Sequence, residues 1–160
     1  MKFKRNNIIF LVLAVLWMIL IFHFSAQRDV VSQQESHNVD KLYFGLFGLD
    51  FEGLSEEEQI LAAEKVDLIV RKSAHAFEYF VLGTLFYFTF KGAVKHPYLC
   101  ALGASALYAC SDEIHQLFVQ GRSGEVRDAL IDTGGALLAL LLIRLIQRIR
   151  NRKRREAETI

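Results

Sequence analysis

Three stretches of the sequence carry residue types that can move protons or hold charged ligands. The first contains Lys72, His75 and Tyr79, spaced at i, i+3 and i+7. At about 100° per residue, these side chains share one stripe of an α-helix, continued by Gly83, and Glu78 points elsewhere. A cation, an imidazole and a phenol on one stripe suit anion binding and acid–base chemistry near neutral pH.

The second stretch contains Asp112, His115 and Gln116 at i, i+3 and i+4, which also share a helical stripe. Glu113 lies about 100° away from that stripe. A carboxylate beside an imidazole can transfer a proton or help to hold a divalent metal ion.

The third stretch follows a tight turn at residues 120–124 that contains Arg122. Beyond the turn, Glu125, Asp128 and Asp132 are spaced at i, i+3 and i+7. Arg122 and Lys72 would attract a phosphate or an anionic lipid headgroup, Arg122 by bidentate geometry. Simple ion pairing of these cations with the carboxylates is the alternative interpretation. The candidate catalytic residues from all three stretches are His75, His115, Asp112, Asp128 and Asp132.

Several familiar sites are missing from the sequence. It has no HExxH, no CxxC, no His pair at i, i+4, no P-loop, no dinucleotide fingerprint and no GxSxG. We therefore assign no metal ligands, and the cofactors stay unknown.

Four apolar runs must position these polar residues. They cover residues 8–24, 74–90, 98–110 and 129–146 and are apolar all round, which is typical of membrane helices. The third run covers only about 20 Å at ~1.5 Å per residue, so a spanning helix must continue to about Val119. The sequence therefore predicts an all-α, integral membrane four-helix bundle with the polar stretches at one depth. The predicted spans are residues 8–24, 72–90, 98–119 and 125–146.

Charge predicts the orientation of these spans. The N-terminus (residues 1–7), the connection at 91–97 and the tail (residues 147–160, with Arg144 just before it) carry 12 of the 19 basic residues, but only two of the 18 acidic ones. The positive-inside rule then places both termini in the cytoplasm of a cell membrane. We attribute the basic tail to this topology and to anionic lipid rather than to nucleic acid.

The connection between the first two spans, residues 25–71, is expected to lie outside the cytoplasm. Ser55 and Glu58 form a capping box at the start of a helix predicted over 56–70. The first span is favoured as a retained anchor, because Phe24 and Ala26 make a poor signal-peptide cleavage site. Cys100 and Cys110 lie ten residues apart on one helix and cannot bridge each other.

Composition places the chain in one domain. It has 160 residues, of which 52% are hydrophobic. Disordered, collagen-like and disulfide-dense classes are excluded by this apolar content, 10 Gly and 2 Cys.

The polar motifs resemble those of the VanZ-like family. The similar stretches are residues 71–79, 111–118 and 121–135, together with Phe24 to Gln27 at the end of the first span. Gln120 departs from the pattern, because members often have Pro there. The resemblance implies a bacterial multi-spanning membrane protein, from a family named after a member linked to low-level teicoplanin resistance. By position, the polar residues of the family fall on Lys72, His75, Tyr79, Asp112, Glu113, Gln116, Arg122, Asp128 and Asp132. Of these, we assign substrate binding to Lys72, Tyr79, Glu113, Gln116 and Arg122.

Three functions remain open at this point. The first is an enzyme that modifies an anionic envelope lipid or a lipid-linked cell-wall component. The second is a non-enzymatic binder of such a lipid or of a lipoglycopeptide. The third is a small proton-coupled transporter or flippase in which Asp132 carries the proton. Membrane lipids are the expected partners, and a homo-oligomer is compatible with so small a bundle.

Overall fold

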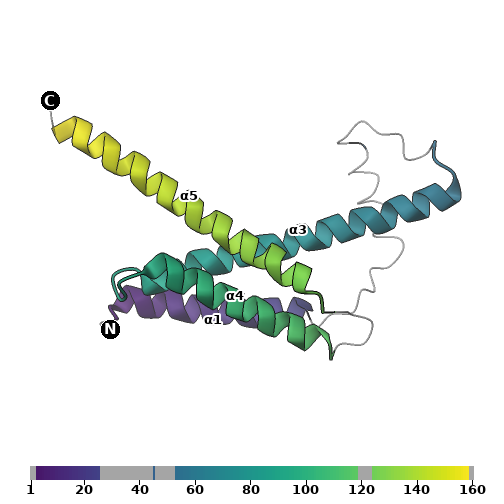
Figure 1. The fold of residues 1–160 in the computed structure, drawn as a ribbon, viewed down its shortest axis with the longest axis horizontal. Helices are drawn as coiled ribbons and strands as arrows, with labels where there is room; N and C mark the ends of the chain where they lie inside the picture. The colour runs from purple at the N-terminus through teal and green to yellow at the C-terminus, as the bar shows by residue number, and fades with distance from the viewer. Residues whose placement is uncertain (1–2, 26–44, 46–52, 119–123, 159–160) are drawn as a thin grey trace.

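The chain is all-α over the part that the computed structural model describes. Those parts are residues 3–25, 45, 53–118 and 124–158, and they contain no strand. The long helices, drawn in Figure 1, are α1 (Arg5–Ser25), α3 (Glu56–Phe90), α4 (Pro97–Gln116) and α5 (Val126–Glu158). The predicted all-α class is confirmed.

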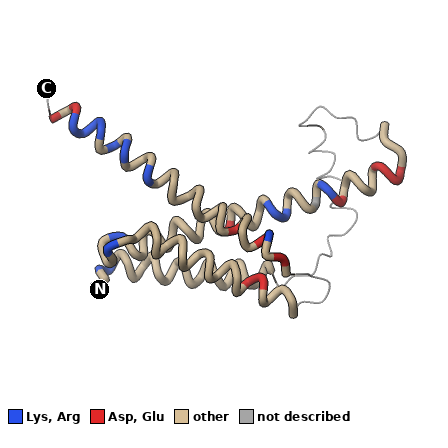
Figure 2. The backbone as a smooth tube through the Cα atoms, viewed as in Figure 1, with Lys and Arg blue, Asp and Glu red and all other residues tan. Residues whose placement is uncertain are grey.

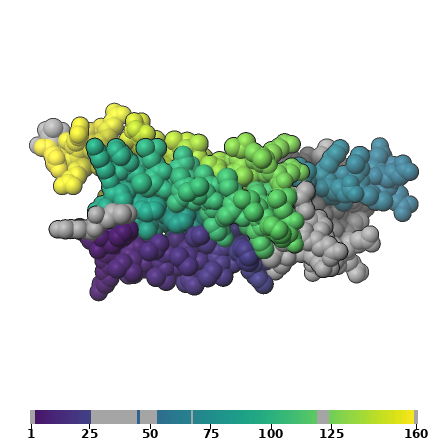
Figure 3. Space-filling view, turned by 60° about the horizontal axis from the view of Figure 1, so that its bottom comes forward, coloured from purple at the N-terminus to yellow at the C-terminus, as the bar shows by residue number. Residues whose placement is uncertain are grey.

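The central element is α3, which packs against each of the other three helices. Figure 3 shows α1 and α4 packed along each other, with the first half of α3 projecting beyond them. In Figure 1, α5 crosses α3 and then leaves the bundle at the opposite end. The core therefore lies between α1, α4, the first half of α5 and the second half of α3.

Small residues allow α3 and α5 to approach closely where they cross. A Cβ atom added to Gly83 would lie 2.9 Å from the Cα of Ala136. A Cβ atom added to Gly135 would collide with the carbonyl oxygen of Ala76. Gly83 therefore permits close packing, and Gly135 does the same from the partner helix.

The helix that leads into the second predicted span is continuous with it. The backbone N–H and the hydroxyl of Ser55 donate to the Glu58 carboxylate at 3.0 and 2.7 Å, so the predicted capping box is present. These hydrogen bonds hold the pKa of Glu58 below its ordinary value. Pro97 occupies the first turn of α4, as its lack of an N–H favours.

Asn7 fastens the start of α1 to the end of α3. Its buried amide donates to the carbonyl oxygens of Phe88, Thr89 and Lys91 at 3.2, 2.8 and 2.9 Å. The last turn of a helix leaves carbonyls without intrahelical partners, and this amide satisfies them. The N-terminus and the connection after α3 therefore lie at the same end of the bundle.

Two helix ends differ from those predicted. The helix α4 ends at Gln116 rather than near Val119, and residues 119–123 lie outside the described part. The basic tail predicted from residue 147 continues α5 as a helix to Glu158.

Two helices, α1 and α5, are long and apolar enough to cross a membrane by length and composition, counting described residues alone. Large apolar side chains also cover the outside of the bundle on every helix. Examples are Leu16 and Ile19 on α1, Phe77 on α3, Leu107 on α4 and Leu130 on α5. Such an exterior is typical of proteins surrounded by lipid rather than by water.

Candidate functional site

Three ionisable side chains from three helices meet inside the bundle. They are His75 on α3, Asp112 on α4 and Asp132 on α5, called here the polar cluster. One nitrogen or oxygen atom of each lies within 4.8 Å of the corresponding atoms of the other two. Asp112 and Asp132 are 2% and 3% exposed, so the cluster lies within the protein and not on its surface. The close crossing of α3 and α5 places His75 beside Asp132.

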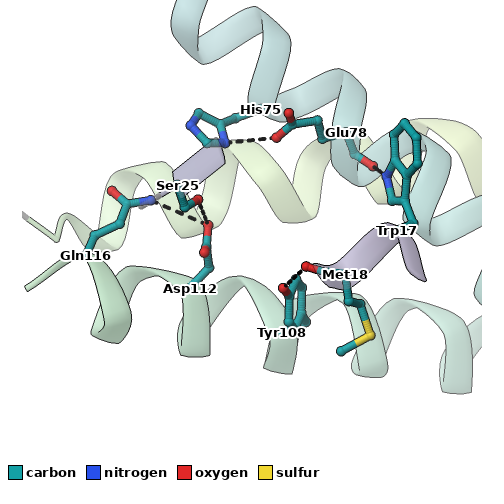
Figure 4. Close-up of polar contacts among 8 residues, drawn as sticks. All are labelled: Trp17, Met18, Ser25, His75, Glu78, Tyr108, Asp112 and Gln116. Atoms are coloured by element: carbon teal, nitrogen blue, oxygen red, sulfur yellow. Dashed lines mark hydrogen bonds and ion pairs between the residues drawn. The ribbon is translucent and has the colours of Figure 1, made fainter. Parts of the chain in front are cut away.

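Asp112 is held by side chains from two helices. Its Oδ2 accepts a hydrogen bond from the Ser25 hydroxyl at 2.7 Å and a longer one from Gln116 Nε2 at 3.4 Å (Figure 4). Ser25 is the last residue of α1 and is fully buried. Sequence analysis did not select Ser25 as a site residue, although it lies in the family-like stretch at the end of the first apolar run.

Glu78 faces His75, contrary to the sequence interpretation. His75 Nδ1 lies 3.2 Å from Glu78 Oε2 (Figure 4). Residues three apart are neighbours on a helix surface, so the long side chain of Glu78 can reach His75 although the two point in different directions from the helix axis. Glu78 therefore stands beside the polar cluster and restricts the orientation of the imidazole.

Tyr79 is fully buried one turn along α3 from His75. Its ring lies beside that of Tyr108 on α4, with 6.1 Å between the ring centroids. No hydrogen-bond partner for the Tyr79 hydroxyl exists among the described residues. The predicted stripe of Lys72, His75 and Tyr79 is thus brought to the same side of α3.

Lys72 and Asp128 form an ion pair between α3 and α5. Their side chains are 21% and 29% exposed, which places the pair nearer to the surface than the polar cluster. Ion pairing of Lys72 with a carboxylate was the alternative to anion binding in the sequence interpretation.

Glu113 and His115 make their described contacts with residues outside the polar cluster. Glu113 Oε2 accepts the backbone N–H of Glu125 at 2.7 Å, which satisfies an otherwise unpaired donor just before α5. The His115 ring stacks on Phe22 of α1, with 4.0 Å between ring centroids. These contacts do not test their predicted roles in binding and catalysis, which stay predictions. Arg122 lies outside the described residues.

Two further hydrogen bonds fix α1 beside the site (Figure 4). Trp17 Nε1 donates to the carbonyl oxygen of Glu78 at 2.9 Å, and the Tyr108 hydroxyl donates to the carbonyl oxygen of Met18 at 2.5 Å. They tie α1 to α3 and to α4 on the same side of Asp112.

Long apolar helices and ionisable groups buried between them define a helical membrane protein. The chain belongs to the VanZ/LLP1 family, whose profile matches residues 10–147. Searches of curated proteins and of solved structures gave no match.

Proposed function

We propose that all four helices cross the bacterial cell membrane. The support is the apolar exterior, which extends over α1, α3, α4 and α5. Residues 72–90 of α3 and the whole of α4 serve as spans although they carry polar side chains. Those side chains turn inward to the polar cluster, because a charge exposed to lipid would be costly.

The proposed orientation places both termini in the cytoplasm. Lys and Arg residues gather at the end of the molecule that holds the N-terminus, the connection after α3 and the end of α5 (Figure 2). Most acidic residues lie toward the other end, together with the Lys and Arg residues of α3, and further acidic residues lie at the tip of α5 (Figure 2). The positive-inside rule assigns the basic end to the cytoplasm, and the polar cluster then lies in the outer half of the membrane.

On this topology, the protein binds an anionic envelope lipid or a lipid-linked cell-wall component through its headgroup. The main support for this proposal is that His75, Asp112 and Asp132 converge in the interior of an apolar bundle. Ionisable residues at such depth cost about 2.5 to 3.5 kcal/mol each on insertion scales, and function is the usual reason to retain them. Lys72 stands at the edge of the cluster, where it can exchange Asp128 for a phosphate. Arg122 is proposed as a second phosphate ligand on its sequence position alone.

Chemical modification of the bound lipid is a second candidate. The approach of His75 to two carboxylates favours it, because an imidazole so placed can accept or donate a proton. The link of the family to teicoplanin resistance is compatible with both candidates.

Native mass spectrometry of the full chain tests the lipid proposal. We expect wild type to retain an anionic lipid and Lys72→Ala and Arg122→Ala to lose it by about tenfold, the magnitude of one charge-assisted hydrogen bond. The matched controls are Lys65→Ala on α3 and Arg127→Ala on α5, which are exposed positions. Equal lipid retention in all four variants would show that Lys72 and Arg122 do not form the anion site. If the protein is an enzyme, His75→Gln abolishes turnover while lipid stays bound.

A further inference from the structure

The polar cluster has the composition of a metal site. It offers one imidazole nitrogen and two carboxylate oxygens, each from a different helix, within 4.8 Å of one another. Metal–ligand bonds of about 2.0 to 2.2 Å bring ligand atoms to within roughly 3.5 Å of each other. Small side-chain rotations would therefore bring these three ligand atoms to bonding distance from one ion.

Two buried oxygen atoms beside the cluster lack partners. Asp112 Oδ1 and the Tyr79 hydroxyl have no hydrogen-bond partner within the described residues, and both side chains are at least 98% buried. A buried polar atom without a partner costs about 1 to 3 kcal/mol. Oxygens left unsatisfied at a single place indicate a missing ligand, and a carboxylate oxygen is a strong metal donor.

Neighbouring side chains orient the possible metal ligands of the polar cluster, as the residues around metal ligands do in metalloproteins. Ser25 and Gln116 hold one oxygen of Asp112 and leave the other for a ligand. Glu78 lies against the imidazole of His75. Metal-binding histidines and carboxylates are usually oriented by such contacts, which contribute about 10- to 100-fold in affinity.

Charge also favours a cation at this place. Asp112, Asp132 and Glu78 bring three carboxyl groups close to one imidazole. Lys72, the cation on the same stripe of α3, is paired with Asp128. A divalent ion would neutralise two of these carboxylates in a medium of low dielectric constant.

We propose that His75, Asp112 and Asp132 bind one divalent metal ion, Mn²⁺ or Zn²⁺. Carboxylates suit Mn²⁺, imidazole suits Zn²⁺, and both ions accept a mixed set. The sequence placed all three residues among the catalytic candidates but gave no metal-ligand motif, because they lie 37 and 20 residues apart on three helices.

The ion would also explain how an acidic cluster can attract an anion. Three protein ligands leave coordination positions for other donors, and a phosphate oxygen is a suitable one. This role in headgroup recognition rests on the proposed function, whereas the metal site itself rests on the geometry.

Metal titration of the full chain in detergent tests the proposal. The protein is stripped with EDTA, exchanged into chelator-free buffer and titrated with MnCl₂ or ZnCl₂ by calorimetry, with Mn²⁺ followed also by electron paramagnetic resonance. We expect one ion per chain, and at least a tenfold loss of affinity in Asp132→Asn and in His75→Gln. Glu64→Gln is the control, because it removes a carboxylate charge at an exposed position of α3, about three turns before His75.

Absence of saturable binding of either ion to wild type would overturn the proposal, whatever the variants do. Unchanged affinity in Asp132→Asn, with helical content confirmed by circular dichroism, would overturn it too. Lipid retention is measured in the same samples with and without EDTA. Metal binding without any effect on lipid supports the metal site and counts against only its link to the headgroup. Lipid binding without metal binding overturns the metal site and leaves the proposed function standing.

Discussion

Asp112 depends on a neighbour from another helix to remain in the bundle interior. Its hydrogen bond from Ser25 joins the end of α1 to α4 and orients the carboxylate toward His75 and Asp132. The partner hydroxyl is fully buried, so water cannot take its place without rearrangement. The geometry of the polar cluster is therefore set partly by a residue with no charge.

Removing this hydroxyl should destabilise the fold. We expect Ser25→Ala to lower the free energy of unfolding by about 1 to 3 kcal/mol, because a buried carboxylate oxygen loses its shortest hydrogen bond. Thermal unfolding in detergent measures the change. Ser111→Ala is the control, since the Ser111 hydroxyl is exposed and bonds only to the carbonyl oxygen of Tyr108 in its own helix. Equal stability of the two variants would contradict the structural role given to Ser25.

Helical phase predicted much of the site at this scale. The stripe of Lys72, His75 and Tyr79 and the positions of Asp112 and Asp132 follow from about 100° per residue. Phase fixes the direction of each Cα–Cβ bond but not the reach of the side chain. For that reason, it misplaced Glu78, and it could not find that His115 stacks on Phe22 while Asp112 turns to Ser25.

The crossing of α3 and α5 is the element-scale feature that creates the cluster. Gly83 and Gly135 let the two backbones approach. His75 directly precedes Ala76, which faces Gly135, and Asp132 lies about one turn before Gly135. A larger residue at the crossing would push the helices apart and separate these two side chains.

Two adjacent glycines of α5 provide a matched test of this contact. We expect Gly135→Ala to destabilise the protein by about 1 to 3 kcal/mol, because its Cβ would collide with the backbone of Ala76. Gly134→Ala places its Cβ in open space and should be neutral or stabilising by up to about 1 kcal/mol. Thermal unfolding compares the two. Similar losses in both would show that the helices do not meet at Gly135.

Apolar runs predicted the four helices well but not all of their ends. Because of its charge, the last part of α5 was predicted to be a tail rather than a helix. Arg, Lys and Glu are nevertheless good helix formers. Ion pairs at i, i+4 between Arg152 and Glu156 and between Arg154 and Glu158 support the helix there. Asn7 stands among other polar residues, next to Arg5 and Asn6, and its contact with the end of α3 depends on tertiary packing.

At the scale of the whole molecule, two helices are longer than a membrane is thick. With 35 and 33 residues, α3 and α5 are about 50 Å long at ~1.5 Å per residue. The hydrocarbon core is about 30 Å thick. In Figure 1 they project at opposite ends, α3 by its acidic start and α5 by its basic end. This asymmetry agrees with the proposed orientation.

Cysteine labelling of spheroplasts tests the central claim, a polar pocket reached from outside the cell. In a chain with Cys100 and Cys110 replaced by Ser, single cysteines are introduced as Asp128→Cys, Ser55→Cys and Arg152→Cys. We predict that a membrane-impermeant maleimide modifies positions 128 and 55 in intact spheroplasts and position 152 only after permeabilisation. Modification of position 128 only after permeabilisation would contradict the account.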